Sequence, residues 1–282
     1  MADAPALRLQ TVPARQGFLW VRQGFRLFLR RPLVFTLLLA AFLFAAMVML
    51  MIPGVGVLLV LMALPLVSLG FMIASRRALA DEPVGPGAFL DGLRGPAPAR
   101  RSMWALLAVY AAANLAVMLL SDVVDGGRFE ALQKAMGAEK GPDAEALAGL
   151  LADPLLLWGM LLRLGLTALI SLPFWHAPAL VHWQGQGVAQ SLFSSSVACW
   201  RNRGALTVYG LGWVALVMLF SLMANALVAL LGEPRLLAMA AMPAGLMFST
   251  AFYASLYFIY VDCFVHASAP GAEPEAPTGP PA

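Results

Sequence analysis

Six long apolar segments alternate with polar segments along the chain. An α-helix rises about 1.5 Å per residue, so about 20 apolar residues cross the roughly 30 Å hydrocarbon core of a bilayer. The six segments, each near or above that length, are 33–52, 57–73, 104–121, 155–174, 205–231 and 237–261. The pattern predicts an all-α fold, a polytopic integral membrane helical bundle with six transmembrane helices.

The segment before the first apolar run has the period of an amphipathic helix. On a helical wheel its arginines share one narrow arc, and its apolar side chains fill the neighbouring arc. The arginines are Arg15, Arg22, Arg26 and Arg30, and the apolar residues are Phe18, Val21, Phe25 and Phe28. We expect a cytoplasmic interfacial amphipathic helix that lies in the membrane surface and contacts lipid head groups through these arginines.

A second amphipathic segment precedes the fifth apolar run. One face consists of Val188, Leu192, Phe193, Val197 and Trp200, and the opposite face of Gln190, Ser191, Ser194, Ser195 and Arg201. We expect this helix also to lie on the membrane surface, with its serines facing water and with Arg201 and Arg203 at lipid head groups. No acidic residue or well-placed histidine accompanies the serines, so the sequence predicts neither a catalytic triad nor an enzyme.

The composition supports a membrane protein. The 282-residue chain is 61% hydrophobic and 12% charged, whereas about 25% of residues are charged in soluble domains. The first apolar run follows 32 residues with six arginines and lacks a small-residue cleavage site, so we expect a retained first helix. Membrane topology explains the net charge of +3, which therefore gives no indication of nucleic-acid binding.

Lysine and arginine are distributed unevenly between the two sides of the predicted bundle. Thirteen lie on the side of the termini and four on the other. The positive-inside rule therefore predicts that both termini lie in the cytoplasm. We expect a cytoplasmic basic segment 1–32, a membrane domain 33–261 with an external loop 122–153, and a disordered Pro-rich cytoplasmic tail 262–282. Cys199 and Cys263 are expected to be free thiols.

Two histidines and two tryptophans gather in the stretch "SLPFWHAPALVHWQGQG", residues 171–187. His176 and His182 are six residues apart, which turns them about 120° from each other on a helix, and no acidic residue lies between Asp153 and Glu233. A helical zinc pair needs the i,i+4 spacing and a nearby glutamate, so we predict no metal and no cofactor. Trp175 and Trp183 are typical of a helix leaving the bilayer.

One charged residue, Arg163, lies well inside a predicted transmembrane segment, about 12 Å from its outer end at 1.5 Å per residue. Asn114 and Asn225 have similar predicted depths on two other helices. The three side chains suggest a polar layer that binds an anion or a lipid head group, with amide oxygens accepting from the guanidinium. In the alternative interpretation Arg163 pairs with Asp122 or Asp125, and the asparagines hold helices together.

Further polar and helix-breaking residues have structural interpretations. Pro65 and Pro243 inside the second and sixth segments predict kinks, with broken helices around a substrate as the alternative. Tyr253, Tyr257 and Tyr260 are expected to anchor the last helix at the cytoplasmic interface.

Several short motifs resemble an uncharacterised family of proteobacterial inner-membrane proteins. They are "WVRQGFRLFLRRPLVF" entering the first segment, "PGVG" after it, Pro65, and "APAL" followed by "ACWRNRGAL". The layout is more distantly similar to YciC-like proteins and to the membrane domain of some glycerophosphodiester phosphodiesterases. The resemblance implies six membrane helices and carries over no catalytic residues, and the phosphodiesterase catalytic domain is absent from this sequence.

The sequence therefore favours a non-enzymatic inner-membrane protein. We expect it to bind membrane lipids, mainly anionic ones, or a membrane partner such as another protein or a second copy, in a role such as envelope homeostasis. The alternative is a transporter of a small anion or lipid, or a membrane subunit of one, with its site at Asn114, Arg163 and Asn225.

Overall fold

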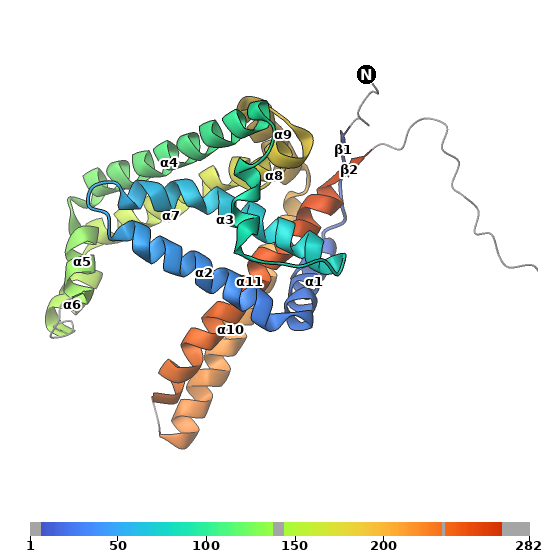
Figure 1. Ribbon diagram of the computed structural model, residues 1–282. Helices are drawn as coiled ribbons and strands as arrows, with labels where there is room; N and C mark the ends of the chain where they lie inside the picture. The colour runs from blue at the N-terminus through green and yellow to red at the C-terminus, as the bar shows by residue number, and fades with distance from the viewer. Residues whose placement is uncertain (1–6, 138–143, 233–234, 267–282) are drawn as a thin grey trace, which may run out of the picture.

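The computed structural model of the chain describes residues 7–137, 144–232 and 235–266. Six helices within them are long and apolar enough to cross a membrane, which confirms the predicted fold class. These are α2 (Pro32–Leu50), α3 (Gly56–Leu79), α4 (Ala97–Asp125), α7 (Pro154–Phe174), α10 (Arg203–Leu231) and α11 (Arg235–Cys263). Figure 1 shows them as three successive pairs, and the α10–α11 hairpin diverges from α4 and α7.

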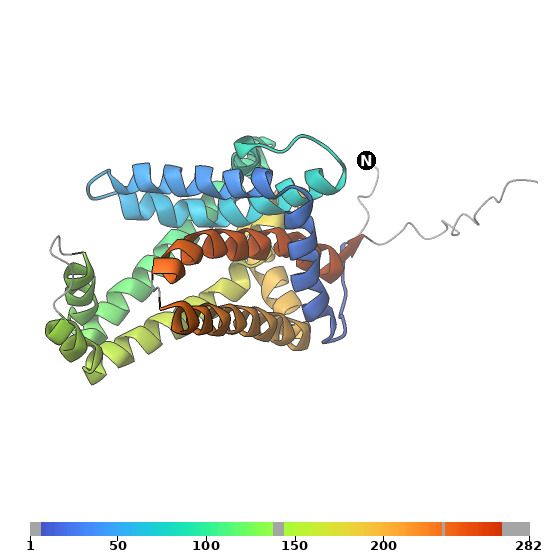
Figure 2. The ribbon, with the colours of Figure 1, turned by 90° about the horizontal axis from the view of Figure 1, so that it is seen from below.

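The remaining elements lie at the two ends of this bundle. The helices α5 (Arg128–Met136) and α6 (Ala144–Leu151) lie at one end, and α1 (Gln16–Arg30), α9 (Val188–Arg201) and the paired strands lie at the other (Figure 2). The short helices η1 (Pro86–Phe89), η2 (Asp91–Leu93) and α8 (Ala177–Gln184) complete the second end. The tail from residue 267 onward, for which we predict disorder, lies outside the described residues.

Local chemistry sets several helix ends. Pro32 and Pro154 occupy the first position of α2 and α7, where a proline has no hydrogen bond to lose. The Asp153 carboxylate caps α7 by accepting from the backbone N–H of Leu155 at 2.8 Å. The helix α4 ends at Gly126, which has a φ of +61°. The third transmembrane helix therefore extends beyond the predicted segment and includes both Asp122 and Asp125.

The helix α1 crosses the end of the bundle and packs against α10 and α11. Trp20 is fully buried there, and its indole donates to the Asp262 carboxylate at 2.7 Å. Gly24 allows the close approach, since a Cβ atom on it would lie 2.5 Å from the carbonyl oxygen of Ala251. The apolar arc differs from the predicted one, because Phe28 is buried whereas Phe18 is 60% exposed. Packing against α10 and α11 therefore holds this helix.

The two described ends of the chain meet beside α9. Strand β1 (Leu7–Leu9) pairs antiparallel with β2 (Phe264–His266). Asn202, between α9 and α10, accepts from the backbone N–H of Val12 at 2.8 Å and donates to the carbonyl of Gln10 at 3.0 Å. These bonds fix the segment that leads into α1.

The structure corrects the predicted orientation of α9. Ser191 and Ser195 are fully buried, whereas Phe193 and Trp200 are about 70% exposed. The Ser195 hydroxyl donates to the carbonyl of Leu172 and accepts from the backbone N–H of His176, both at 3.0 Å. The expectation that the serines face water is wrong because small polar side chains permit close helix packing in a membrane protein, where exposed apolar side chains have lipid as solvent.

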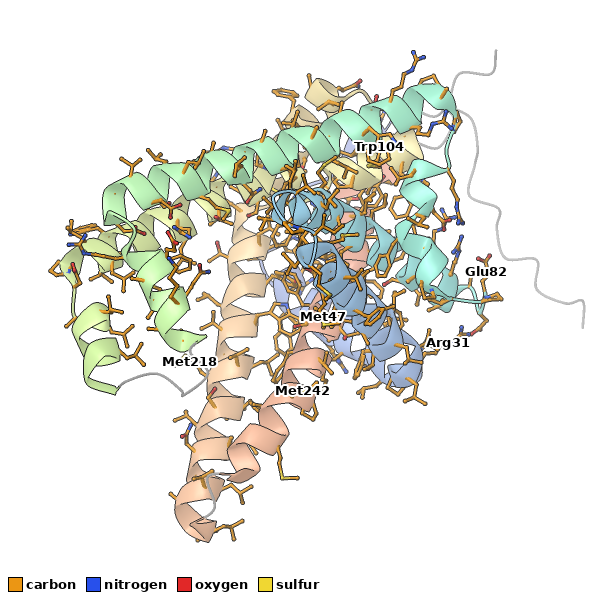
Figure 3. The ribbon with its side chains drawn as sticks, turned by 60° about the vertical axis from the view of Figure 1, so that its left-hand side comes forward. Arg31, Met47, Glu82, Trp104, Met218 and Met242 are labelled. Carbon is orange, nitrogen blue, oxygen red and sulfur yellow. The ribbon has the colours of Figure 1, made fainter. Side chains whose placement is uncertain are left out.

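The far half of the α10–α11 hairpin exposes apolar side chains. Met218 of α10 and Met242 of α11, labelled in Figure 3, are 60% and 73% exposed. At the opposite end, Figure 3 shows Arg31 beside Glu82, whose carbonyl accepts from the guanidinium at 3.0 Å. Exposed apolar side chains on the transmembrane helices match the apolar hydrocarbon core of a bilayer.

Candidate functional site

An apolar groove of about 800 Å³ lies between α7, α9 and α10. Its walls are mainly aliphatic and aromatic, with Leu169 and Pro173 from α7, Phe193 and Trp200 from α9, and Leu206 from α10. We call this cavity the α9 groove. Its volume is within the range of roughly 300–1,000 Å³ that small-molecule sites occupy.

Two arginines border the α9 groove. Arg201 ends α9 and Arg203 begins α10, and both are exposed. The guanidinium carbon of Arg203 lies 5.2 Å from the centre of the Trp200 ring. Neither arginine forms an ion pair with a carboxylate in the part of the chain that the structure describes. The groove thus combines an apolar interior with positive charge that lacks a described carboxylate partner.

Cys199 also lines the α9 groove. Burial raises the pKa of its thiol to about 12, although a hydrogen bond with Ser195 acts in the opposite direction. The thiol is therefore protonated at neutral pH, and a protonated thiol is a poor nucleophile.

The predicted head-group arginines of α1 lie on its exposed side. Arg15, Arg22, Arg26 and Arg30 are exposed, and none forms an ion pair with another described residue. Arg26 and Arg30 border a smaller pocket of about 180 Å³ that Gln23 also lines. The structure therefore places these four arginines at the same end of the bundle as Arg201 and Arg203, as Figure 2 shows for the helices that carry them.

Arg163 has a different environment at the opposite end. Its guanidinium lies 2.6 Å from the carboxylate of Asp122 and 3.7 Å from that of Asp125, and it stacks 3.9 Å from the centre of the Phe129 ring. Asp125 is fully buried, and its second carboxylate oxygen accepts from the backbone N–H of Gly127 at 2.8 Å. This is the ion-paired arrangement that the sequence left open as the alternative.

The two asparagines of the predicted polar layer bond to their own helices. The side-chain amide of Asn114 donates to the carbonyl of Tyr110 at 2.9 Å, and that of Asn225 to the carbonyl of Ser221 at 2.7 Å. Asn114 is buried on α4, whereas Asn225 is exposed on α10. No hydrogen bond described for Arg163 reaches either amide. The ligand-binding role of these three residues stays a prediction.

A second ion pair lies at this end. We call the residues of the two ion-paired groups, Asp122, Asp125, Arg163, Arg128 and Asp153, the charged cluster. Arg128, at the start of α5, contacts the Asp153 carboxylate that caps α7. The bond from Arg128, followed by the backbone bond from Leu155, holds the pKa of Asp153 below its usual value. These contacts join α5 to α4 and α7, so the charged cluster stabilises the packing of these three helices.

The histidine stretch forms part of the packed interior. His176 is fully buried, and its ring centre lies 5.3 Å from that of Phe264. Trp183 contacts Tyr260 with ring centres 4.9 Å apart. Within residues 7–137, 144–232 and 235–266, no group of three or more His, Cys, Asp or Glu side chains is arranged to hold a metal ion.

The α9 groove was not predicted from the sequence, because the amphipathic pattern of α9 does not show which helix or solvent contacts each of its faces. The face with Phe193 and Trp200 was visible in the sequence, and so were Arg201 and Arg203. The sequence signal for the groove was the serine-rich face of the same helix. Such a face can contact water, and it can also pack closely against another helix.

Comparison with known proteins identifies one relative. The probable inner membrane protein BTH_II0599 of Burkholderia thailandensis is 37% identical over 261 residues, which cover 92% of this chain and 94% of the relative. No family model matches the chain, and no solved structure matches it.

Proposed function

The chain belongs to the inner-membrane protein family of this Burkholderia thailandensis relative, and from that premise we propose that it binds an anionic phospholipid in the α9 groove. The protein is multi-pass, and we propose a non-enzymatic role. The observation that carries the proposal is an apolar groove of about 800 Å³ bordered by two arginines that have no described carboxylate partner.

The groove has the two chemical features that a phospholipid requires. An acyl chain fits apolar walls such as Leu169, Pro173 and Phe193. These side chains have no hydrogen-bonding groups, so contact with a hydrocarbon leaves no polar group unsatisfied. A guanidinium pairs with a phosphate through two parallel N–H bonds, and Arg201 and Arg203 supply two such groups at the border.

The distribution of charge supports the same side for lipid binding. Outside the predicted transmembrane segments, thirteen lysines and arginines belong to the side of the termini and four to the other, and the eighteenth, Arg163, lies within a predicted segment. We propose that this side is cytoplasmic, where anionic lipids attract basic residues by about 1 kcal/mol for each Lys or Arg near the surface. The arginines of α1 add to this attraction.

The proposal is tested by thermal unfolding of the detergent-purified protein with added phosphatidylglycerol or phosphatidylcholine. A ligand that binds the folded state raises its stability in proportion to ln(1 + [L]/Kd). We expect phosphatidylglycerol to raise the melting temperature of the wild type and phosphatidylcholine to raise it less. The double variant Arg201→Gln/Arg203→Gln should lose at least half of the phosphatidylglycerol shift.

A matched control separates the groove from general surface charge. Arg100 and Arg101 are also exposed arginines without a described ion pair, and they lie outside the groove lining. The variant Arg100→Gln/Arg101→Gln should keep the full shift, and Thr207→Trp, which fills the groove, should lose it. Equal shifts in the two double variants would show that lipid responds to net charge and not to the groove.

Transport at Arg163 is the second candidate function. It requires an accessible cation, whereas Arg163 pairs with Asp122 and lies close to Asp125. A central cavity of about 220 Å³ is lined by residues such as Pro65, Tyr110 and Trp175, and Arg163 is not among its lining residues. The pairing favours lipid binding over transport. Uptake of an anion that stops in a folded Arg163→Leu variant would reverse this preference.

A further inference from the structure

A further pocket, of about 350 Å³, lies between α3, α8 and α11. Arg76, Trp183, Gln184, Tyr257, Tyr260 and Phe264 line it, and we call it the aromatic pocket. It shares no lining residue with the α9 groove, so its occupant is an independent question.

Arg76 supplies positive charge at the aromatic pocket. It is exposed and has no ion pair with a described carboxylate, whereas its neighbour Arg77 pairs with Asp91 at 2.9 Å. Its guanidinium carbon lies 5.6 Å from the centre of the Trp183 ring. This contact holds the guanidinium at the pocket and leaves its N–H donors available for an oxyanion.

Aromatic rings form the other walls. The Trp183 ring centre lies 4.9 Å from that of Tyr260 and 6.2 Å from that of Tyr257. The indole N–H of Trp183 is buried and has no described acceptor, although a buried donor normally has one. The Tyr260 hydroxyl accepts a hydrogen bond from the Gln184 amide at 3.3 Å. The walls thus offer flat apolar surface together with polar groups.

From this combination we propose that the aromatic pocket binds a phosphate ester carried on a ring. The phosphate pairs with the Arg76 guanidinium, and the ring stacks against Trp183 and Tyr257. A ring matches these walls because flat surfaces make extensive contact at low entropic cost. A phosphate ester on a ring occurs with a flat ring in a soluble aryl phosphate and with a puckered polyol ring in the head group of a lipid such as phosphatidylinositol.

The soluble form is tested by titration calorimetry of the full-length protein in detergent with phenyl phosphate and with inorganic phosphate. We expect phenyl phosphate to bind at least tenfold more tightly than inorganic phosphate. Arg76→Gln should weaken phenyl phosphate binding at least tenfold, and Tyr257→Leu should reduce the preference for phenyl phosphate over inorganic phosphate. Arg76 is exposed, so its replacement leaves no buried partner and the variant should remain folded.

The lipid form is tested with nanodiscs that contain phosphatidylinositol or phosphatidylglycerol. If phosphatidylinositol stabilises the protein more than phosphatidylglycerol does, and Arg76→Gln loses this difference, the ligand is the lipid head group. If phenyl phosphate binds in the calorimeter and Arg76→Gln weakens that binding, the ligand is the soluble ester. Arg100→Gln serves as the matched control in both arms. The proposal is wrong if Arg76→Gln and Arg100→Gln behave alike, or if the wild type responds to neither probe.

Failure of this proposal is distinguishable from failure of lipid binding in the α9 groove. The variant Arg201→Gln/Arg203→Gln should leave phenyl phosphate binding unchanged, and Arg76→Gln should leave the phosphatidylglycerol shift unchanged. A loss of both signals in either variant would contradict two separate sites.

Discussion

Arginine has opposite roles at the two ends of this bundle. At the α4–α5–α7 end, Arg163 and Arg128 each contact a carboxylate, and one of the carboxylates nearby, that of Asp125, is fully buried. At the α9 groove, Arg201 and Arg203 have no described carboxylate partner. The comparison teaches that the neighbouring acids, and not the depth predicted for an arginine, indicate whether its charge is available to a ligand.

The largest expected effect comes from removing one charge at each end. Arg163→Leu leaves Asp125 buried without its nearby cation, so we expect a loss of about 3 kcal/mol in the free energy of unfolding. Arg203→Leu should change stability by less than about 0.5 kcal/mol, because an exposed arginine without an ion pair is replaced. Unfolding by SDS in mixed micelles measures both. Equal losses in the two variants would remove the distinction between the ends.

Gly159 and Gly165 allow a smaller test on one helix. A Cβ atom at Gly159 would lie 2.5 Å from the Cβ of Asp125, whereas one at Gly165 would meet no atom within 4 Å. We expect Gly159→Ala to destabilise the protein by about 1–3 kcal/mol through overpacking, and Gly165→Ala to leave stability nearly unchanged. The same micelle unfolding measures the pair. A stable Gly159→Ala would mean that the charged cluster packs loosely.

A pH series tests the bond between Arg128 and Asp153. This bond lowers the pKa of Asp153 from its ordinary value of 3.8, so its contribution to stability is present above pH 3.8 and is lost as the pH falls through the lowered pKa. The melting temperatures of wild type and Arg128→Gln should therefore differ at pH 6, and they should converge as the pH falls from about 3.8 through the lowered pKa of Asp153. Asp153→Asn, which retains a capping side chain for α7, should show the same convergence.

The smallest effect concerns Cys199 at the α9 groove. Because its thiol is buried and has a raised pKa of about 12, we expect slow labelling by N-ethylmaleimide at pH 8 in the folded protein. In a Cys263→Ala variant, mass spectrometry follows Cys199 alone. Labelling as fast as in the SDS-unfolded protein would show that the groove opens far more than its described form.

The fold was predictable because the membrane imposes it. Apolar length alone located the six transmembrane helices, since a bilayer permits few other structures for such segments. The predicted third segment ends four residues before the end of α4, at residue 121. The last turn of α4 contains Asp122 and Asp125, which the hydropathy pattern assigns to the loop. Their inclusion in α4 is what brings them to Arg163.

The functional surfaces were predictable only in part. Sequence identified the arginines at both ends and named Asp122 and Asp125 as alternative partners of Arg163. It did not identify the neighbours of α9, because a face of serines is compatible with water and with helix packing alike. In the structure Ser191 and Ser195 are buried, and Ser195 bonds to the backbone at Leu172 and His176. It also treated Trp183 and Tyr260 as separate interface anchors, although the fold brings them together.

The pairing of β1 with β2 has a consequence for the order of assembly. Leu7–Leu9 are synthesised before the six membrane helices, and their partner Phe264–His266 is synthesised after them. All six helices are therefore synthesised before this contact can form, and the bonds that join Asn202 to Gln10 and Val12 cannot form before α9 has been made. The segment that leads into α1 is therefore made early, and its pairing with β2 forms only once Phe264–His266 has been synthesised.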